Sequence, residues 1–345
     1  MSNTMFIFVV ALSFALAGTP VLRSLARRIG FFDRPAARKL QRAPIPLMGG
    51  LAIYAGVTVA ILIFGQSYLP ELASILIGAT VVSLLGLWDD RVELPALAKL
   101  AGQLLAAGGL VLAGVQVRLG FLPDWLNVVL TIGWITGISN AINFLDNMDG
   151  LAGGISAVAA AFLTVIAAMN GQYLVSSFAA AVFGACLGFL FFNSSPATIF
   201  MGDAGSLFLG FTLAALGIKL RFPDNINIVT WMVPVLVMGV PIFDTTLVII
   251  SRIRRRVNPF TTAGKDHTSH RLVRRGLTQR EAVFLLYLAG CACGILAIFV
   301  MQANVPEGYQ VGAAVLAVAL WALWRLERNP KERTDVEEKE TPQTT

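Results

Sequence analysis

The chain has 345 residues, of which 56% are hydrophobic and only 13% are charged, and its mean hydropathy is +0.74. This composition excludes an ordinary soluble domain and is typical of an integral membrane protein that crosses the bilayer several times. The net charge of +6 does not indicate nucleic-acid binding, because the basic residues follow the membrane topology described below. Cys186, Cys291 and Cys293 lie in apolar segments and have no disulfide or metal-ligand spacing.

Apolar segments that are long enough to cross a membrane recur along the whole chain, since a transmembrane helix needs about 20 apolar residues. We predict an all-α polytopic membrane protein with about eleven transmembrane helices. Ten is the alternative, because the segment at 125–142 is short and carries Asn127 and Asn140. The predicted spans are 5–25, 48–66, 72–88, 97–115, 125–142, 151–169, 173–192, 204–220, 228–251, 282–301 and 310–325.

The lysines and arginines predict the orientation of these spans. With the N-terminus outside, 23 of the 26 basic residues fall at the cytoplasmic ends of the spans, and only Arg118, Lys219 and Arg221 fall on the other side. Cytoplasmic loops of membrane proteins are enriched in Lys and Arg. We therefore expect the first span to be uncleaved with its N-terminus outside, and the C-terminus to be cytoplasmic.

Four polar motifs share the cytoplasmic side in this topology: "WDDRVE" at 88–93, "NFLDNMDG" at 143–150, "FMGDAGS" at 200–206 and "KDHTSHR" at 265–271. Aspartate is a common helix N-cap, so capping explains Asp149 or Asp203 when each is taken singly. Capping does not explain why several aspartates, Glu93, Lys99 and both histidines gather on one face. We therefore predict an active site at the cytoplasmic face, where ionisable groups need a function to offset their cost near lipid.

These residue types suit phosphoryl transfer that is assisted by a divalent metal ion. Carboxylates around Mg²⁺ neutralise a pyrophosphate, and the glycines in "MDGLAGG" and "MGDAGS" would let backbone N–H groups approach phosphate at helix N-termini. Lys99 and the basic cluster at 265–275 supply positive charge for the diphosphate and the leaving group. We expect His267 and His270 to contact phosphate rather than metal, because oxygen-rich neighbours favour Mg²⁺ over Zn²⁺.

Asp244 stands apart from these motifs, within a predicted span that Pro234 and Pro241 interrupt. A structural role, in which Asp244 bonds to a backbone group freed by a proline, and a catalytic role are equally open. Arg252, two turns further along the chain, is its candidate partner.

Six segments between residues 30 and 290 together resemble the polyprenyl-phosphate N-acetylhexosamine-1-phosphate transferases. They are "FFDRPAARKLQRAPIPLMGGLAIY", "GLWDDRVELPALAKLAGQ", "NAINFLDNMDGLAGG", "NSSPATIFMGDAGSLFLG", "PIFDTTLVIISR" and "NPFTTAGKDHTSHRL", in this order. The resemblance implies transfer of a phospho-sugar from a UDP-linked N-acetylhexosamine to undecaprenyl phosphate, with release of UMP. This reaction would start the synthesis of a lipid-linked cell-envelope glycan.

The resemblance also implies a role for each matching residue. Asp203 would be the principal Mg²⁺ ligand and Asp146 a second one, with Mn²⁺ as a substitute ion. Asp89 would be the base for the lipid phosphate or a covalent nucleophile. The implied catalytic residues are Asp89, Asp90, Asp146, Lys99, His267 and His270. The implied substrate-binding residues are Asn143, Met148, Asp149, Asn193, Phe200 and Arg271, of which Asn193, Phe200 and Met148 resemble a uracil pocket.

The chain departs from the family pattern at three places. Glu93 stands where many members have Asp, Gln41 stands where relatives often carry His, and the "DHTSH" motif lacks the histidine run of the peptidoglycan enzyme. The last departure favours UDP-N-acetylglucosamine as the donor over the UDP-muramoyl-pentapeptide. A more remote alternative is an ion-coupled transporter with Asp146, Asp149 and Asp244 as relay groups, but its ionisable sites would be reachable from both sides.

The resemblance completes the expected organisation. Residues 1–325 would form a single transmembrane catalytic domain in the bacterial inner membrane, and 326–345 a charged, disordered cytoplasmic tail. The expected partners are the UDP-sugar, undecaprenyl phosphate and membrane lipids, with no nucleic acid, and a homodimer is one open arrangement.

Overall fold

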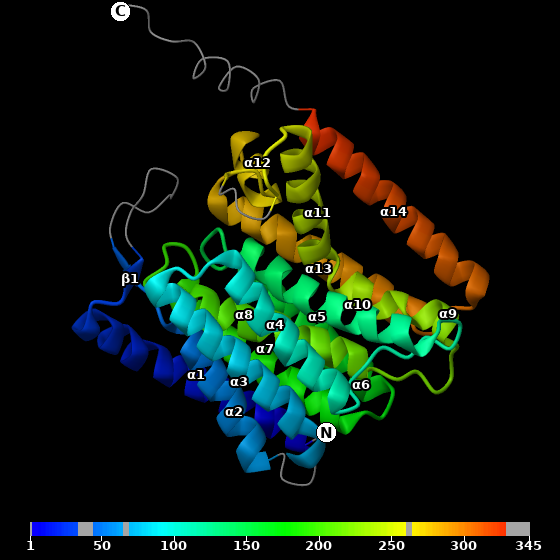
Figure 1. Ribbon diagram of the computed structural model, residues 1–345, viewed down its shortest axis with the longest axis horizontal. Helices are drawn as coiled ribbons and strands as arrows, with labels where there is room; N and C mark the ends of the chain where they lie inside the picture. The colour runs from blue at the N-terminus through cyan, green and yellow to red at the C-terminus, as the bar shows by residue number, and fades with distance from the viewer. Residues whose placement is uncertain (1, 34–43, 65–68, 260–263, 329–345) are drawn as a thin grey trace, which may run out of the picture.

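The computed structural model describes residues 2–33, 44–64, 69–259 and 264–328, and these residues form a helical bundle (Figure 1). The helices are α1 (Ser2–Ile29), α2 (Gly49–Phe64), α3 (Leu69–Val92), α4 (Ala96–Leu112), α5 (Asp124–Leu145), α6 (Leu151–Met169), α7 (Tyr173–Asn193), α8 (Gly202–Lys219), α9 (Asn227–Thr230), α10 (Met232–Val237), α11 (Gly239–Arg254), α12 (Thr268–Arg274), α13 (Gln279–Val300) and α14 (Val305–Glu327). Two short antiparallel strands, β1 (Phe32–Asp33) and β2 (Ile45–Pro46), pair Phe32 with Pro46.

The prediction of an all-α polytopic membrane protein is confirmed, and each predicted span coincides with a helix or a helix pair. Seven described helices are long and apolar enough to cross a membrane, or eight when the pair Asn227–Val237 and Gly239–Arg254 counts as one span. The apolar helices α2 and α4 are shorter. The number of eleven spans and the orientation therefore stay predictions. Helix α14 continues past the expected domain boundary to Glu327, and 329–345 lie outside the described residues.

The predicted span at 228–251 is sharply broken. The helix pair bends by 74° between Val237 and Gly239. Pro241, in the first turn of α11, has no N–H to continue the hydrogen-bond ladder of α10, so a new helix axis begins there. The break gives α11 a direction of its own, toward α12 (Figure 1).

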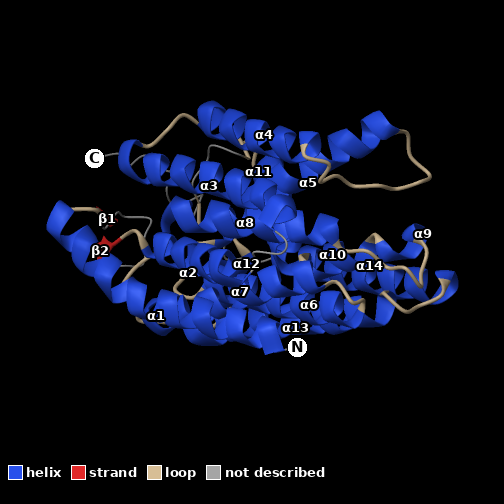
Figure 2. Cartoon of the chain, turned by 90° about the horizontal axis from the view of Figure 1, so that it is seen from below, coloured by secondary structure: helices blue, strands red, loops and turns tan. Residues whose placement is uncertain are grey.

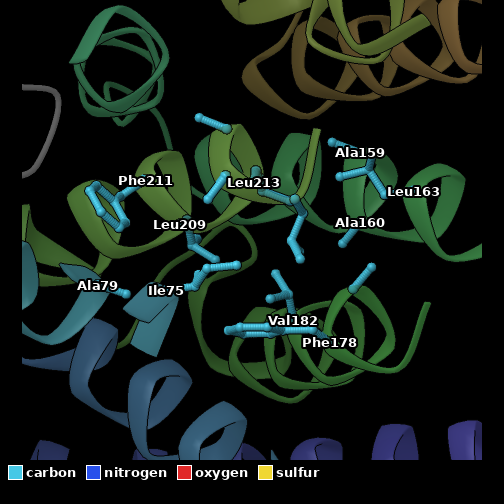
Figure 3. Close-up of a cluster of buried hydrophobic side chains, with 14 of the residues drawn as sticks. Ile75, Ala79, Ala159, Ala160, Leu163, Phe178, Val182, Leu209, Phe211 and Leu213 are labelled. Carbon is cyan, nitrogen blue, oxygen red and sulfur yellow. The ribbon is translucent and has the colours of Figure 1, made fainter. Parts of the chain in front are cut away.

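Helix α8 forms the centre of the bundle, and every residue from Ala204 to Ile218 is buried. Figure 3 shows side chains of α8 meeting those of α3, α6 and α7, among them Phe211, Ile75 and Phe178. Lipid tails are as apolar as these side chains, so close packing rather than exclusion of water holds such helices together. Seen along a second direction, α4 and α5 lie on one side of the bundle and α1 and α13 on the other (Figure 2).

Backbone hydrogen bonds tie the start of α8 to the strand pair. The N–H of Phe200 donates to the carbonyl of Pro46 at 2.9 Å, and the N–H of Gly49 donates to the carbonyl of Phe200 at 2.9 Å. The N–H of Gly50 continues the pairing to the carbonyl of Met201 at 2.8 Å. The first turn of α8, which carries Asp203, is therefore held by the segment that leads into α2.

Candidate active site

Lys99 joins three helices at one end of the bundle. From the first turn of α4, its ammonium group donates to Oδ2 of Asp89 at 2.8 Å and also to Oδ2 of Asp203. A longer contact of 3.5 Å reaches Oδ1 of Asn143. Asp89 lies in the last turn of α3, Asp203 in the first turn of α8 and Asn143 in the last turn of α5. One half-buried cation therefore brings together residues that the sequence separates by more than one hundred positions.

The amide of Asn143 completes this cluster. Its Nδ2 donates to Oδ1 of Asp203 at 2.8 Å and to Oγ of Ser206 at 2.9 Å. The Asp203 carboxylate is thus held by Asn143 on one oxygen and by Lys99 on the other. Ser206 was not among the predicted site residues, although it stands one helical turn after Asp203 within "MGDAGS", on the same face of α8.

Asp90 has a different position from its neighbour Asp89. Its carboxylate accepts the N–H of Asp203 at 2.9 Å and the N–H of Ala204 at 3.2 Å. Asp90 therefore caps the N-terminus of α8 from another helix, where a negative charge is favourable. Gly202 makes this approach possible, because its φ is +72° and a Cβ there would lie 2.5 Å from Oδ2 of Asp90. The carboxylate predicted to act in catalysis is engaged in positioning Asp203.

Among the site carboxylates that the structure describes, Asp146 has the fewest partners to offset its negative charge. It follows the last residue of α5, and in the described part of the chain no hydrogen bond or ion pair reaches its side chain. Burial and the charges of nearby carboxylates raise its pKa to about 8. The carboxylates, in decreasing order of effect, are Asp203, Asp90, Asp149 and Asp33. Asp33, in β1, was not among the predicted site residues, although it lies in the first segment that resembles the family.

The donor chemistry around Asp146 and Asp203 fits a hard divalent cation. Carboxylate and amide oxygens are the ligands that Mg²⁺ takes in proteins, and Mg²⁺ usually keeps several waters and uses only one or two carboxylates. Among the described residues no three His, Cys, Asp or Glu side chains form a ready-made metal site. Asp146 and Asp203 thus offer the oxygen donors that Mg²⁺ takes, rather than the Cys and His ligands typical of zinc.

Residues that the family resemblance assigned to nucleotide binding form hydrogen bonds with the loop between α7 and α8. Oδ1 of Asn193 accepts the N–H of Gly150 at 3.0 Å, and its Nδ2 donates to the carbonyl of Ile199 at 2.9 Å. Oδ2 of Asp149 accepts the N–H of Ala197 at 3.0 Å. Both polar atoms of the Asn193 amide are used and only 3% of the residue is exposed. In this arrangement, Asn193 and Asp149 hold the backbone of the loop between α7 and α8 through hydrogen bonds.

The two apolar members of the expected uracil pocket have different surroundings. Met148 is 7% exposed and packs in a hydrophobic cluster with Leu145 and Val240, so it does not line an open pocket. Phe200 is only half-buried, and its own N–H and carbonyl pair with Pro46 and Gly49 in the segment leading into α2. Of the proposed uracil-binding residues, Phe200 alone keeps a side chain available for stacking.

The glycines of the two glycine-rich motifs serve close helix packing. A Cβ at Gly154 would lie 2.0 Å from the Tyr287 ring, and one at Gly205 would lie 2.5 Å from the Cα of Gly50. The first N–H groups of α8 are taken by Asp90, as described above. At α8 the N–H groups of Asp203 and Ala204 already bond to the Asp90 carboxylate, and the approach of phosphate to these helix N-termini stays a prediction.

The histidine motif folds over the C-terminal end of α5. His267 is 6% exposed, and its ring meets the Phe144 ring edge-on with centroids 6.3 Å apart. Oγ of Ser269 donates to Oδ1 of Asn147 at 2.6 Å. Because Phe144 and Asn147 flank Asp146 in the chain, these contacts connect α12 to the segment that carries the carboxylate cluster.

Asp244 does not pair with Arg252. Oδ2 of Asp244 lies 2.8 Å from Nδ1 of His267, and its Oδ1 accepts the N–H of Thr268 at 2.6 Å. Arg252 is bidentate on Asp266, with contacts of 2.9 and 3.1 Å. The suggested Asp244–Arg252 pair is therefore wrong, because each residue has a partner from the loop that precedes α12.

His270 is electrically neutral near pH 7. Burial lowers its pKa to about 4, together with the positive charges of His267, Arg274 and Lys265. Its ring lies 6.1 Å from that of His267, centroid to centroid. A neutral imidazole does not supply the positive charge that we expected of this histidine, although it retains a hydrogen-bonding nitrogen.

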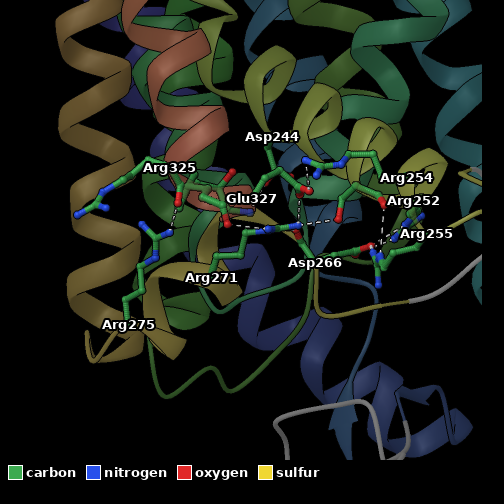
Figure 4. A network of polar contacts seen from close by, with 12 residues as sticks. Asp244, Arg252, Arg254, Arg255, Asp266, Arg271, Arg275, Arg325 and Glu327 are labelled. Carbon is green, nitrogen blue, oxygen red and sulfur yellow. Dashed lines mark hydrogen bonds and ion pairs between the residues drawn. The ribbon is translucent and has the colours of Figure 1, made fainter. Parts of the chain in front are cut away.

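Arg271 belongs to a buried ion-pair network rather than to the carboxylate cluster (Figure 4). It is 2% exposed, and its guanidinium group donates to the carbonyls of Asp266 and Leu326 at 2.8 and 2.9 Å and to Oγ of Ser251 at 2.8 Å. Its Nη2 also lies 2.8 Å from Oε1 of Glu327. In this structure the donors of Arg271 fasten α12 to α11 and α14, and its role in substrate binding stays a prediction.

Asp266 is the acidic centre of the same network. Burial alone would raise the pKa of its carboxyl, but the hydrogen bonds and charge of Arg252, with the charges of His267 and Arg255, lower it to about 2. Asp266 therefore stays ionised throughout the physiological range and holds the loop that delivers His267.

Comparison with known proteins identifies relatives along most of the chain. The profile of glycosyl transferase family 4 matches residues 72–221. The chain is 38% identical over 306 residues to a probable undecaprenyl-phosphate N-acetylglucosaminyl 1-phosphate transferase of Bacillus subtilis, covering 86% of this chain and 85% of that protein.

Two further relatives carry similar names. A decaprenyl-phosphate N-acetylglucosaminephosphotransferase of Mycolicibacterium smegmatis is 34% identical over 77% of this chain and 74% of its own length. An undecaprenyl-phosphate alpha-N-acetylglucosaminyl 1-phosphate transferase of Escherichia coli is 28% identical over 87% of this chain and 84% of its own length. By these similarities, the chain belongs to glycosyl transferase family 4, among the polyprenyl-phosphate N-acetylhexosamine-1-phosphate transferases.

Proposed function

We propose that the protein transfers N-acetylglucosamine-1-phosphate from UDP-N-acetylglucosamine to undecaprenyl phosphate and releases UMP. The observation that carries the proposal is the Lys99 cluster, where one ammonium group and an amide hold Asp89 and Asp203 among further carboxylates. Such a cluster suits a diphosphate that arrives with a divalent cation. The names of the relatives support the same reaction.

The donor and acceptor meet at the cytoplasmic face of a bacterial plasma membrane in this proposal. The nucleotide sugar is soluble, whereas the acceptor phosphate is confined to the membrane surface. Figure 1 shows β1 and α12 toward the same end of the bundle. The distribution of basic residues supports a cytoplasmic orientation for this end. The product would start a lipid-linked cell-envelope glycan.

Asp203 and Asp146 are the residues that would hold Mg²⁺, or Mn²⁺ as a substitute. When bound, the ion would offset the negative charge of the diphosphate and of the carboxylates themselves. The residues of the chain have separate tasks. Asn143 and Lys99 orient the Asp203 carboxylate, and Asp90 fixes the backbone of the same residue.

The chemical step exchanges one P–O bond for another. An oxygen of undecaprenyl phosphate attacks the phosphorus that is linked to the sugar, and the bond from this phosphorus to UMP breaks, so that UMP leaves with the electron pair. Asp89 accepts the proton of the lipid phosphate when that phosphate is a monoanion. Lys99, already beside Asp89, supplies positive charge for the phosphates, where charge develops in the transition state.

The donor sugar is proposed on two grounds. The chain has "DHTSH" in place of a histidine run, and the similar proteins named above carry N-acetylglucosamine in their names. Both favour UDP-N-acetylglucosamine over the UDP-muramoyl-pentapeptide. The one-sided placement of the carboxylates speaks against an ion-coupled transporter.

The test is an assay of UMP release with purified protein and undecaprenyl phosphate, comparing the two UDP donors with and without a chelator. We expect turnover with UDP-N-acetylglucosamine that requires Mg²⁺. Asp203→Asn keeps the size and capping ability of the side chain but removes a carboxylate, and it should lower the rate on the order of 10³-fold. Asp224→Asn, at an exposed loop residue, is the control. Normal activity of Asp203→Asn, or turnover of the muramoyl-pentapeptide donor only, would overturn the proposal.

A further inference from the structure

Asp244 is buried in the second half of the broken span, with 1% of the residue exposed. Its two carboxylate oxygens have separate partners on the next element. Oδ1 accepts the backbone N–H of Thr268 at 2.6 Å and so caps α12, and Oδ2 lies 2.8 Å from Nδ1 of His267. A single carboxylate therefore fixes both the start of α12 and the ring that precedes it.

The contact with Asp244 determines where His267 carries a proton. An ionised carboxylate is only an acceptor, so the ring nitrogen that faces it must be a donor. The proton therefore sits on Nδ1, whether the ring is neutral or cationic. In the described part of the chain no hydrogen bond reaches Nε2. This nitrogen is consequently the atom of His267 that is left to accept or donate a proton.

The surroundings of His267 hold the ring in one orientation. Phe144 and His270 meet it edge-on, and the Phe144 ring is itself covered by the Arg252 guanidinium group, 5.9 Å from its centroid. Helix α12 has further anchors that do not involve Asp244, because Arg271 binds Ser251 and Glu327. A change at Asp244 that keeps the cap should therefore leave α12 in place.

We propose that Asp244 is a positioning residue, which holds the proton of His267 on Nδ1 and leaves Nε2 available to the reacting phosphates. The availability of Nε2 to the phosphates rests on the proposed function, since it takes His267 to meet the substrates. The position of the proton on Nδ1 concerns the chain alone. Asp244 does not touch the substrates in this proposal and acts only through His267.

The substitution Asp244→Asn separates capping from positioning. The amide has one acceptor oxygen, which continues to accept the N–H of Thr268, and its NH₂ group then faces Nδ1 as a donor. Nδ1 must accept, so the proton of the neutral ring moves to Nε2. The same exchange in the Ser-His-Asp triad leaves the geometry intact and produces the wrong tautomer.

The readout is the ¹⁵N spectrum of histidine-labelled protein in nanodiscs. The chain has only two histidines, so a spectrum of His270→Gln assigns His267 without further labelling. We expect a protonated Nδ1 at every pH in the wild type. In Asp244→Asn the neutral ring should have a bare Nδ1 and a protonated Nε2. A bare Nδ1 in the wild type, or an unchanged tautomer in Asp244→Asn, would overturn the proposal.

Activity gives a second, independent readout. Asp244→Asn should lower kcat on the order of 10²-fold, the usual range for loss of acid–base function, with a smaller change in KM for UDP-N-acetylglucosamine. Because Asp244 acts through His267, the double variant Asp244→Asn with His267→Gln should be no less active than His267→Gln alone. A further loss in the double variant would indicate a structural role and contradict the proposal.

Thr246→Val is the matched control on the same helix. Thr246 is exposed and its hydroxyl donates to the carbonyl of Ile242 within α11, so both readouts should stay at wild-type values. If Asp244→Asn does not fold, the wild-type spectrum still decides the position of the proton. If the wild type releases no UMP, the proposed function fails while the spectrum continues to test the Asp244–His267 contact.

Discussion

Asp89 and Asp90 illustrate how two neighbouring residues of one type obtain different chemistry. Successive side chains on an α-helix point about 100° apart, so at the end of α3 the two carboxylates face different elements. Asp89 meets Lys99 of α4 at 2.8 Å, and Asp90 meets the first N–H groups of α8. Asp90 is thus fixed on the backbone of α8, whereas Asp89 lies beside the ammonium group of Lys99 and stays the predicted base for the lipid phosphate.

The first prediction concerns Asp89→Asn and separates two mechanisms. As a general base, Asp89 is needed while the lipid phosphate is protonated, and the second pKa of a phosphate monoester is about 6. The variant should lose most of its activity toward pH 6 and below, where much of the acceptor carries a proton, and recover part of it as the pH rises to about 9, where the acceptor needs no base.

The pH profile of UMP release between pH 6 and 9 is the measurement. A covalent nucleophile would behave differently, because an amide cannot carry the phospho-sugar and the variant would be inactive at every pH. Exchange of labelled UMP into the UDP-sugar without any lipid acceptor would contradict the general-base role, if this exchange is lost in Asp89→Asn.

A second prediction at this scale follows from the pKa of His270, which burial and its charged neighbours lower from an ordinary 6.5 to about 4. The charged groups around it are His267, Arg274, Lys265 and Asp244. Between these two values the unfolded chain binds a proton that the folded chain does not, so stability falls as the pH falls. The contribution is fully present above pH 6.5 and is lost by about pH 4.

The apparent midpoint of thermal unfolding should therefore decrease less steeply in His270→Gln than in the wild type between pH 6.5 and pH 4. His270→Gln removes the titrating group while keeping a polar side chain. Parallel curves for the two proteins across this window would mean that His270 titrates normally.

At the scale of elements, glycines allow α8 to approach its neighbours. A Cβ on Gly50 of α2 would lie 2.2 Å from the Cα of Gly205, and a Cβ on Gly86 of α3 would lie 2.4 Å from the backbone of Asp203. Small residues at helix contacts are the usual means of tight packing in membranes. Here the same contacts fix the position of α8 along α2 and α3, so that its first turn reaches Lys99 and Asp90.

The third prediction tests this packing with Gly50→Val. The added side chain cannot fit against the α8 backbone, and overpacking of this kind costs about 1–3 kcal/mol. We expect a lower unfolding midpoint together with a marked loss of activity, because the N–H of Gly50 also bonds to the carbonyl of Met201, just before Asp203.

Gly108→Val is the matched control, since this glycine also lies within an apolar helix but a Cβ there would have no neighbour within 4 Å. The cost of valine in a helix is similar at both positions, so the difference between the variants reports the α2–α8 contact. Equal effects of the two substitutions would show that this contact does not position α8.

At the scale of the whole molecule, the polar motifs with Lys99 and both histidines gather toward one end of the bundle. Polar side chains lie there at the ends of α3 and α5, at the starts of α4 and α8, and on α12. Helix α9 lies toward the other end of the bundle (Figure 1). Charged groups are costly inside a bilayer. A position at the interface lets water, metal and phosphate reach them.

The fourth prediction tests the orientation by labelling single cysteines in a variant whose native cysteines at 186, 291 and 293 are alanine. Lys265 and Asp224 are both exposed, and the predicted topology puts them on opposite sides of the membrane. A membrane-impermeant maleimide applied to intact cells should label Asp224→Cys and leave Lys265→Cys unlabelled until the membrane is permeabilised. Labelling of both positions in intact cells would refute this topology.

The sequence by itself determined the class of the protein and the segments of its helices. Apolar runs near membrane length are a local property, so the spans and the polar motifs between them could be found without tertiary information. The residue types in these motifs also indicated phosphate and metal chemistry. The order of six motifs indicated the family, which the comparison with known proteins then confirmed.

Only the tertiary structure decided which polar residue meets which. Asn193 and Arg271 were selected as substrate-binding residues by type and motif, yet folding uses their donors on backbone carbonyls and ion pairs. Asp244 gained a partner 23 residues away, and Asp90 capped a helix that begins 112 residues after it. A carboxylate can serve as base, ligand, cap or hydrogen-bond acceptor, and the choice depends on contacts between distant segments. No local pattern encodes these contacts, because they exist only once the helices have packed.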